Sequence, residues 1–264
     1  MKTLTKIFFV VLLFLGLWFG LTQIDFVKYF GIQNMSSKTE KTIGDLIWKE
    51  IERTEHVIYD NDITETLDSL LLPLCKKNGI DRNSLKIHIV RKDEVNAFAF
   101  PDRRLVVYSG LILECKNEEA LLGILGHEIA HIEKNHVMKK LSKEIGLATL
   151  LTATGANSQI VMEIFRTISS SAYDRSLERE ADIQSVKYLL NAEIDPMPFA
   201  DFMYELSLDN DFHKYTYWIS THPESEERSQ YIMNFLKSKN IKSKEILSDN
   251  SWKNFKQNIR DYDY

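Results

Sequence analysis

The stretch that most constrains this chain is residues 126–131, which read Gly-His-Glu-Ile-Ala-His. On an α-helix, side chains four residues apart lie on one face, so His127 and His131 can both reach a single metal ion. Glu128 stands beside the first histidine, where a carboxylate can act as a general base on water. The pattern predicts a zinc site built for hydrolysis, with a chance match on a solvated helix as the alternative.

The residues before this motif predict a buried helix. Asn117 is a good N-cap, and the two glutamates that follow it suit the positive end of the helix dipole. Residues 120–126 are apolar or glycine, and a helix that is apolar nearly all round is buried. Gly123 and Gly126 permit close approach of a neighbouring backbone. This context disfavours a chance match on a surface helix.

Length and composition bound the class of protein. The 264 residues are enough for one well-packed domain or two small ones. The net charge of -5 argues against a nucleic-acid partner, because there is no basic excess to neutralise phosphates. The two cysteines, Cys75 and Cys115, are too few for a disulfide scaffold or a thiolate zinc cluster. One disulfide between them and two free buried thiols both remain open.

The N-terminus resembles an export signal. Lys2 and Lys6 precede a run from Ile7 to Leu21 that contains only apolar residues and glycine. No small-x-small cleavage site follows, and about eighteen apolar residues just suffice to span a bilayer. We expect residues 1–24 to be a signal anchor or a signal peptide, with the body outside the cytoplasm, facing the periplasm or exported. A second apolar patch, residues 145–151, is too short to span a membrane and favours a helix on the core or beside the cleft, with a surface that lies on a membrane as the alternative.

Helices are expected directly after this segment. Residues 25–42 end in a polar stretch and are predicted to be a linker, and residues 43–240 to be the folded domain. Apolar residues at helical spacing predict helices near Ile43–His56 and Ile63–Lys77. Pro73 is expected to kink the second helix or to end it early.

Short strands are expected next. They lie at Lys86–Val90, Val95–Phe100 and Leu105–Tyr108, and Pro101–Arg103 between the last two favours a hairpin. The C-terminal tail, residues 241–264, is polar with scattered aromatic residues. A packed helix and a contact with a partner are both open for it.

A catalytic zinc usually has three protein ligands, and the best third candidate lies in residues 176–182. Glu178 and Asp182 are four residues apart and share one helical face. Glu178 can bind zinc, while Asp182 can accept a hydrogen bond from a histidine ligand. Glu180 projects nearly opposite and is expected in solvent. An ordinary charged helix surface is the alternative for this segment.

The sequence gives a different prediction for each of two further histidines. His136 lies five residues beyond His131, about 500° around a continuous helix, so it is expected to point away from the ligand face. His222 precedes Pro223, which suits the first position of a helix. His222 is therefore expected at the N-cap of a helix that runs to about Phe235, from where it could point into the cleft or serve only as a cap.

An ordered set of motifs resembles family forty-eight of the metallopeptidases, which includes the HtpX, BepA and Oma-type proteases and the CAAX prenyl protease. The likeness covers residues 45–238, and the single apolar segment resembles the periplasmic members. The motifs are Asn96-Ala97-Phe98-Ala99-Phe100-Pro101, Ser109-Gly110-Leu111, Gly126-His127-Glu128-Ile129-Ala130-His131, Glu178-Arg179-Glu180-Ala181-Asp182, and Thr221-His222-Pro223 with Arg228.

The resemblance implies an α+β, mostly helical, gluzincin-like fold with a small β-sheet beside the HExxH helix. It implies that Glu178 is the third ligand of one zinc ion per chain and that Glu128 is the general base. In similar periplasmic proteases the histidine of the His-Pro pair approaches the zinc. His222 is then either a fourth ligand that shuts the site or a group that stabilises an oxyanion. Arg228 is expected to pair with Asp182 or to face the cleft.

The substrate is expected to bind along the strand that holds Asn96, Ala97 and Phe98. An exposed strand edge can pair with the backbone of an extended polypeptide. The family often has Pro-Gly-Gly after this strand, where the chain has Pro101-Asp102-Arg103. The shape of the hairpin tip is therefore left open.

These features predict a zinc-dependent endopeptidase. The resemblance implies that it hydrolyses misfolded or misassembled envelope proteins, with polypeptides as substrates, the membrane as a contact of the N-terminal segment, and no nucleic acid. The alternative is a latent protease that acts mainly as a chaperone-like binding or assembly factor. A non-catalytic protein with a degenerate site is disfavoured, because Glu128, which zinc binding alone does not need, is intact.

Overall fold

The computed structural model describes residues 6, 8–9, 11–14, 16, 37–146, 150, 158–208, 212–239, 241, 243–244 and 246–262. Most of the expected signal segment, residues 1–24, and of the apolar patch at residues 145–151 lies outside the described residues. Within the described part of the chain, no helix is both long and apolar enough to cross a membrane. Residues Ser37–Tyr264 form a compact unit of their own.

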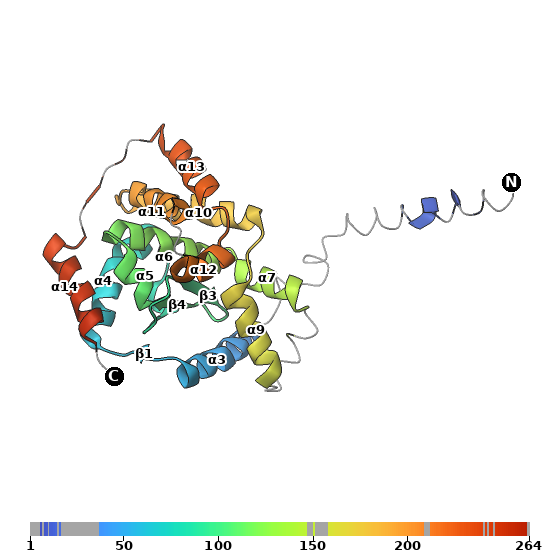
Figure 1. The fold of residues 1–264 in the computed structure, drawn as a ribbon, viewed down its shortest axis with the longest axis horizontal. Helices are drawn as coiled ribbons and strands as arrows, with labels where there is room; N and C mark the ends of the chain where they lie inside the picture. The colour runs from blue at the N-terminus through green and yellow to red at the C-terminus, as the bar shows by residue number, and fades with distance from the viewer. Residues whose placement is uncertain are drawn as a thin grey trace. The chain divides into compact units, whose positions relative to one another are not determined.

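This unit has the expected α+β fold and is mostly helical (Figure 1). Its described elements are α3 (Ser37–Thr54), β1 (Val57–Ile58), α4 (Asn61–Lys77), the short 3-10 helix η2 (Arg82–Ser84), β2 (Lys86–Val90), β3 (Ala97–Phe100), β4 (Arg104–Tyr108), α5 (Ser109–Glu114), α6 (Glu118–Glu133), α7 (His136–Glu144), α9 (Ser158–Ser170), α10 (Arg175–Asn191), α11 (Met197–Leu208), α12 (Phe212–Thr221), α13 (Ser225–Leu236) and α14 (Asp249–Asp261).

The strands form one sheet in the order β1-β2-β4-β3. β2 and β4 are parallel, and the other neighbours are antiparallel. The three predicted strands are confirmed within two residues at each end, whereas the two-residue β1 is too short to leave a sequence pattern. Trp48 of α3 stacks on His88 of β2 with ring centroids 3.7 Å apart, while α6 contacts β3 and β4. β3 is an edge strand.

The backbone at the tip of the β3–β4 hairpin has a conformation that suits glycine, which family forty-eight often has at these two positions. Asp102 and Arg103 both adopt the left-handed conformation, with φ of 71° and 55°, which is strained for residues other than glycine. Side-chain contacts offset the strain. Asp102 pairs with Lys86, and Arg103 lies 2.5 Å from Glu133 at the end of α6.

Two helices differ from the sequence prediction at their ends. α3 begins at Ser37, so residues 37–42 of the expected linker are helical. Pro73 does not end α4, which continues to Lys77. Proline removes one backbone hydrogen bond, but Leu70, Leu71 and Leu74 of the same helix are fully buried and hold the last turns in place.

The C-terminal tail contains a packed helix, which was one of its two open alternatives. Trp252, Phe255 and Ile259 of α14 are buried, and α14 contacts α4 and α5. Cys75 lies in α4, and Cys115 directly follows α5. Both are buried free thiols, so the disulfide is not formed.

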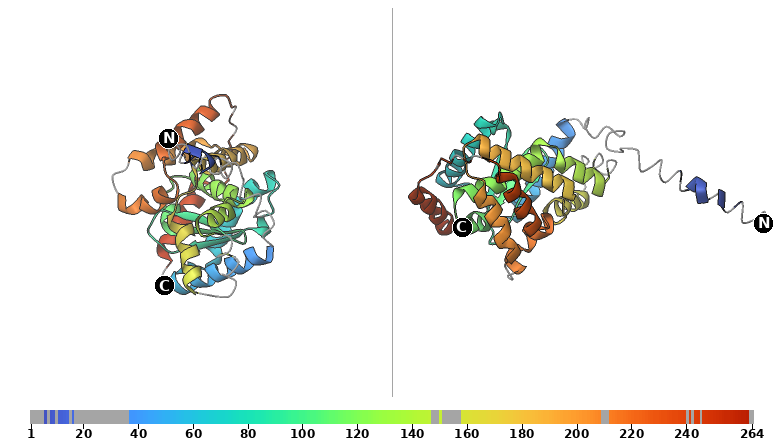
Figure 2. Two further views of the ribbon diagram at one scale, coloured as in Figure 1. Left: turned by 90° about the vertical axis from the view of Figure 1, so that its right-hand side faces the viewer. Right: turned by 90° about the horizontal axis from the view of Figure 1, so that it is seen from above.

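Helix α6 lies at the centre of the unit and carries the Gly-His-Glu-Ile-Ala-His motif. Its N-cap is Asn117, as predicted, and the side chain accepts a 3.0 Å hydrogen bond from the N–H of Ala120. α10 and α11 pack on one side of α6 and β3 on another. In Figure 1, α10, α11 and α13 lie above α6, and Figure 2 (right) looks down on this helical layer. The close approach depends on glycine, since a Cβ at Gly126 would lie 2.7 Å from Oγ of Ser185 in α10.

We expect Gly123→Ala to destabilise the fold, although alanine favours a helix over glycine by about 1 kcal/mol. A Cβ at Gly123 would lie 2.3 Å from Cβ of Phe199 in α11, and such overpacking typically costs about 1–3 kcal/mol. Gly126→Ala is the comparison variant, because its Cβ would meet only Oγ of Ser185 closely, and that hydroxyl can move away at the cost of its 2.6 Å hydrogen bond to the carbonyl of Gly123. Urea unfolding should give the larger loss of free energy of unfolding for Gly123→Ala. Equal losses, or a more stable Gly123→Ala protein, would contradict this packing.

Candidate metal centre

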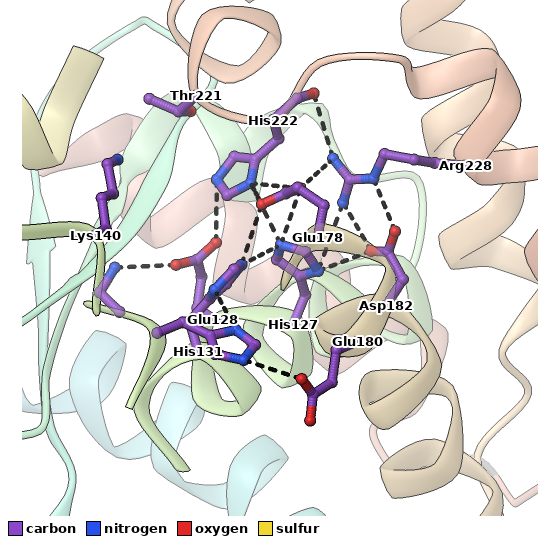
Figure 3. A network of polar contacts seen from close by, with 12 residues as sticks. His127, Glu128, His131, Lys140, Glu178, Glu180, Asp182, Thr221, His222 and Arg228 are labelled. Atoms are coloured by element: carbon purple, nitrogen blue, oxygen red, sulfur yellow. Dashed lines mark hydrogen bonds and ion pairs between the residues drawn. The ribbon is translucent and has the colours of Figure 1, made fainter. Parts of the chain in front are cut away.

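Three helices bring four possible metal ligands together (Figure 3). α6 carries His127 and His131 one turn apart, α10 carries Glu178, and His222 directly follows α12. Their ligand atoms all lie within 4.8 Å of one another. The Nε2 atoms of His127 and His131 are 2.9 Å apart, and Nδ1 of His222 is 3.3 Å from Nε2 of His127. Both carboxylate oxygens of Glu178 are 3.1 Å from the same Nδ1.

The donor set fits a metal ion. Zinc binds histidine nitrogen and carboxylate oxygen at about 2.0–2.2 Å, usually at the corners of a tetrahedron whose edges are then about 3.3–3.6 Å. The three separations of 2.9, 3.1 and 3.3 Å given above are equal to these edges or slightly shorter. Lone pairs gathered this closely repel one another unless a cation or protons lie between them. The arrangement is therefore suited to one small cation.

The centre is closed to solvent in this conformation. None of the four ligand side chains, nor Glu128 beside them, is more than 2% exposed. Charges interact more strongly in such a region than in water, because the surroundings have a low dielectric constant. A polypeptide cannot reach the ligands without a movement of the covering segments.

A buried network of charges supports the ligands. Oδ1 of Asp182 lies 2.7 Å from Nδ1 of His127, the contact by which a carboxylate fixes the orientation of a histidine ligand. Arg228 donates to both oxygens of Asp182, at 2.7 and 2.8 Å, and lies 2.9 Å from Glu178. Tyr231, which no sequence pattern singles out, also donates to Asp182. Burial acts to raise the pKa of Asp182, but Arg228 and then His127 hold it below its usual range.

Glu128 lies between the sheet and the ligands. Its Oε2 accepts a 2.9 Å hydrogen bond from the N–H of Ala99 in β3, and its Oε1 lies 3.3 Å from Nε2 of His222. Complete burial raises the pKa of Glu128 to about 7, and the negative charge of Glu178 adds to the rise. A carboxyl group of this kind can both accept and release a proton near neutral pH.

The predicted position of His222 at a helix N-cap is wrong. His222 extends the end of α12, where its N–H donates a 2.8 Å hydrogen bond to the carbonyl of Trp218. Pro223 has no N–H with which to continue that helix. α13 begins only at Ser225, after Glu224 in the left-handed conformation. This end of α12 nevertheless brings the imidazole of His222 into the ligand group.

The prediction that His136 points away from the ligands is also wrong. α6 ends at Glu133, and Asn135 takes the left-handed conformation with φ of 56°. α7 therefore starts in a new direction at His136, whose Nδ1 lies 3.1 Å from Nδ1 of His131. The rotation of 500° holds only for a continuous helix, and Asn135 interrupts it.

Aromatic rings enclose the histidines. Tyr173 stacks on His131 with ring centroids 3.9 Å apart, and Trp218 lies 4.3 Å from the ring of His222. The ammonium group of Lys140 lies 4.3 Å from the centre of the Tyr173 ring. These residues have no spacing pattern relative to the ligands, so the sequence alone does not reveal them.

The expected substrate strand lies beside Glu128, but it is covered. Ala97 and Phe98 belong to the edge strand β3, and Asn96 directly precedes it. The prediction of an exposed edge is wrong for its side chains, which are at most 3% exposed, because Phe165 of α9 packs against Phe98. Both polar side-chain atoms of Asn96 are buried without a hydrogen-bond partner among the described residues.

Sequence comparisons agree with this geometry. The profile of Peptidase family M48 matches residues 61–235. The chain belongs to peptidase family M48. It is 25% identical to the beta-barrel assembly-enhancing protease of Yersinia pestis over 209 residues, which are 74% of this chain and 43% of that protein. It is 27% identical to the mitochondrial metalloendopeptidase OMA1 of Bos taurus over 171 residues, 58% of this chain and 33% of the relative. The chain thus spans less than half the length of these M48 relatives.

We expect Asp182→Asn to weaken zinc binding by about 10–100-fold. The amide keeps the shape of the side chain but loses the charge that orients His127 and balances Arg228. Competition with a fluorescent chelator measures the Kd. Asp174→Asn, at the exposed N-cap of the same helix α10, is the control and should bind zinc as wild type does. Equal Kd values for both variants would show that Asp182 does not support the ligand.

Proposed function

We propose that this chain is a zinc-dependent endopeptidase. The observation that carries the proposal is the position of Glu128 beside the buried group of candidate ligands, where its Oε1 lies 3.3 Å from Nε2 of His222. Membership of peptidase family M48 supports it. A site that only bound zinc for stability would not need a carboxylate beside the ligands with a pKa near neutrality.

The chemistry divides between the metal and the chain. A zinc ion held by His127, His131 and Glu178 supplies a Lewis acid that polarises the scissile carbonyl and acidifies water. Glu128 takes a proton from the attacking water and gives it to the leaving amine. The N–H of Ala99 fixes Oε2 of Glu128, so Oε1 is the atom that carries the proton.

The edge of β3 is the proposed binding line for the substrate backbone. The N–H of Ala99 donates to Glu128, so the edge of β3 that no strand pairs with lies on the side of the metal centre. An extended peptide that pairs with the edge has its backbone beside Glu128. The unpartnered side chain of Asn96 supports this role, because a buried amide without partners gains free energy when a substrate satisfies it.

A latent state is the second candidate, and the position of His222 favours it. Its Nδ1 lies among the ligand atoms, where a fourth ligand of zinc would stand, and the centre is buried. In this state the protein would bind clients without cleaving them. If the closed site opens, Nε2 of His222 can instead donate to the oxyanion of the substrate.

We further propose that the body acts outside the cytoplasm on misfolded or misassembled envelope proteins. The basic and apolar N-terminal segment supports export or membrane anchoring. The name of the relative from Yersinia pestis connects that protein with β-barrel assembly. Broad selectivity for unfolded chains is consistent with recognition through backbone pairing.

Glu128→Gln tests the catalytic role. The amide cannot accept the proton, so the rate of cleavage of unfolded casein should fall by at least about 10²–10⁴-fold while zinc remains bound. Glu119→Gln, in the first turn of the same helix, should retain the activity of the wild type. Proteolysis retained by purified Glu128→Gln would exclude the mechanism.

His222→Ala tests latency. If Nδ1 of His222 closes the site, its removal should raise the initial rate of casein cleavage and leave one zinc ion per chain. Thr221→Ala is a neighbouring control that keeps the imidazole. A lower rate than wild type would contradict a purely inhibitory role and favour the oxyanion role. No cleavage by either protein would favour the binding function.

A further inference from the structure

A second line of contacts leads from the ligands to the surface through His136. Nδ1 of His136 lies 3.1 Å from Nδ1 of His131, and both side chains are fully buried. On the other side of the ring, Nε2 of His136 lies 3.4 Å from Oε2 of Glu180. Glu180 is 46% exposed, as expected, and its other oxygen lies 3.3 Å from Lys134. Figure 3 draws the imidazole contact of Glu180 as a dashed line.

These contacts assign the protons on both rings. Nε2 of His131 faces His127 and Glu178, so it must be free of a proton to bind a metal ion, and the proton lies on Nδ1. A buried N–H needs an acceptor. Nδ1 of His136 is in the place of that acceptor, so His136 carries its own proton on Nε2, the atom that faces Glu180.

Nε2 of His136 has no partner among the described residues besides Glu180. Nε2 of His136 is buried and has no hydrogen bond to the described residues apart from this contact with Glu180, which is at the outer limit of hydrogen-bond length. A small shift of the exposed Glu180 side chain would shorten the contact. Glu180 is two residues from Glu178, so the line runs from α6 through α7 to the helix that carries the third ligand.

The two α6 histidines are therefore supported in different ways. His127 is held directly by Asp182, which is itself fixed by Arg228. His131 has a neutral ring as its neighbour, and the carboxylate stands one residue further out. Histidine ligands usually donate to a carboxylate, a carbonyl or water, and a second imidazole can take the same place because it has one acceptor nitrogen.

We propose that His136 is a positioning residue for the metal centre, which accepts a hydrogen bond from His131 and is oriented in turn by Glu180. The inference rests on the proposed zinc function of His131. The left-handed turn at Asn135 serves this contact, because it returns the chain toward the ligand that α6 has just presented. His136 needs no contact with substrate to act in this way.

The zinc Kd of four variants tests the proposal, measured by competition with a fluorescent chelator. His136→Ala removes the acceptor, and we expect zinc affinity to fall by about 10–100-fold. His136→Asn places an amide oxygen near the position of Nδ1 and should recover most of the affinity. His136→Gln places its oxygen near Nε2 and should not. His88→Ala removes a half-buried histidine far from the ligands in the sequence and should bind zinc as wild type does.

Two further measurements separate support of the metal from support of the fold. Thermal unfolding of the metal-free proteins reports the stability of each variant without zinc. Glu180→Ala should weaken zinc binding by only a few-fold, because its carboxylate is partly exposed and acts through His136. If His136→Ala does not fold, the comparison of His136→Asn with His136→Gln still decides between the two roles.

The outcomes are distinct. Recovery of zinc affinity by His136→Asn but not by His136→Gln supports the hydrogen bond to His131. Equal zinc affinity for wild type and His136→Ala, or equally weak binding by the Asn and Gln variants, overturns the inference and leaves the proposed function intact. A wild-type protein that binds no zinc overturns the proposed function itself.

Discussion

The structure depends on a buried group of opposite charges. Arg228 lies against the carboxylates of Asp182 and Glu178, and none of the three is more than 2% exposed. Removing an ion from water costs several kcal/mol, so each buried charge must have partners. Two carboxylates share one guanidinium here, which leaves an excess of one negative charge beside three imidazoles. When Glu128 is ionised as well, the excess is two negative charges, which a divalent cation among the imidazoles and Glu178 would balance.

The packing of the helices follows from the need to bring these groups together. The candidate ligands and the residues that support them come from α6, α10, α13 and the end of α12, which are far apart in the sequence. Small residues on α6 allow α10 and α11 to approach, and the sheet closes the other side of α6. The hydrogen bond from Ala99 to Glu128 then joins the sheet to the metal centre. The same closeness excludes solvent, so one arrangement both forms the centre and shuts it.

The sequence predicts the site residues that recur at helical spacing. His127 with His131, and Glu178 with Asp182, are pairs four residues apart, and the structure brings both pairs together. The wrong predictions concern residues at the ends of helices, where the chain changes direction. The position of His136 depends on one left-handed residue, and the position of His222 on how a helix ends before proline. Aromatic residues that enclose the histidines, and the covering of β3 by α9, depend on contacts between distant segments, which no local pattern reports.

The most direct test of the account is the metal content of the purified native protein. Elemental analysis should find close to one zinc ion per chain in the wild type. A variant in which His127 and His131 are both alanine should retain the fold, as judged by circular dichroism, and contain almost none. A wild-type protein that is natively folded, contains no zinc and takes up none from solution would contradict the assignment of His127, His131 and Glu178 as metal ligands.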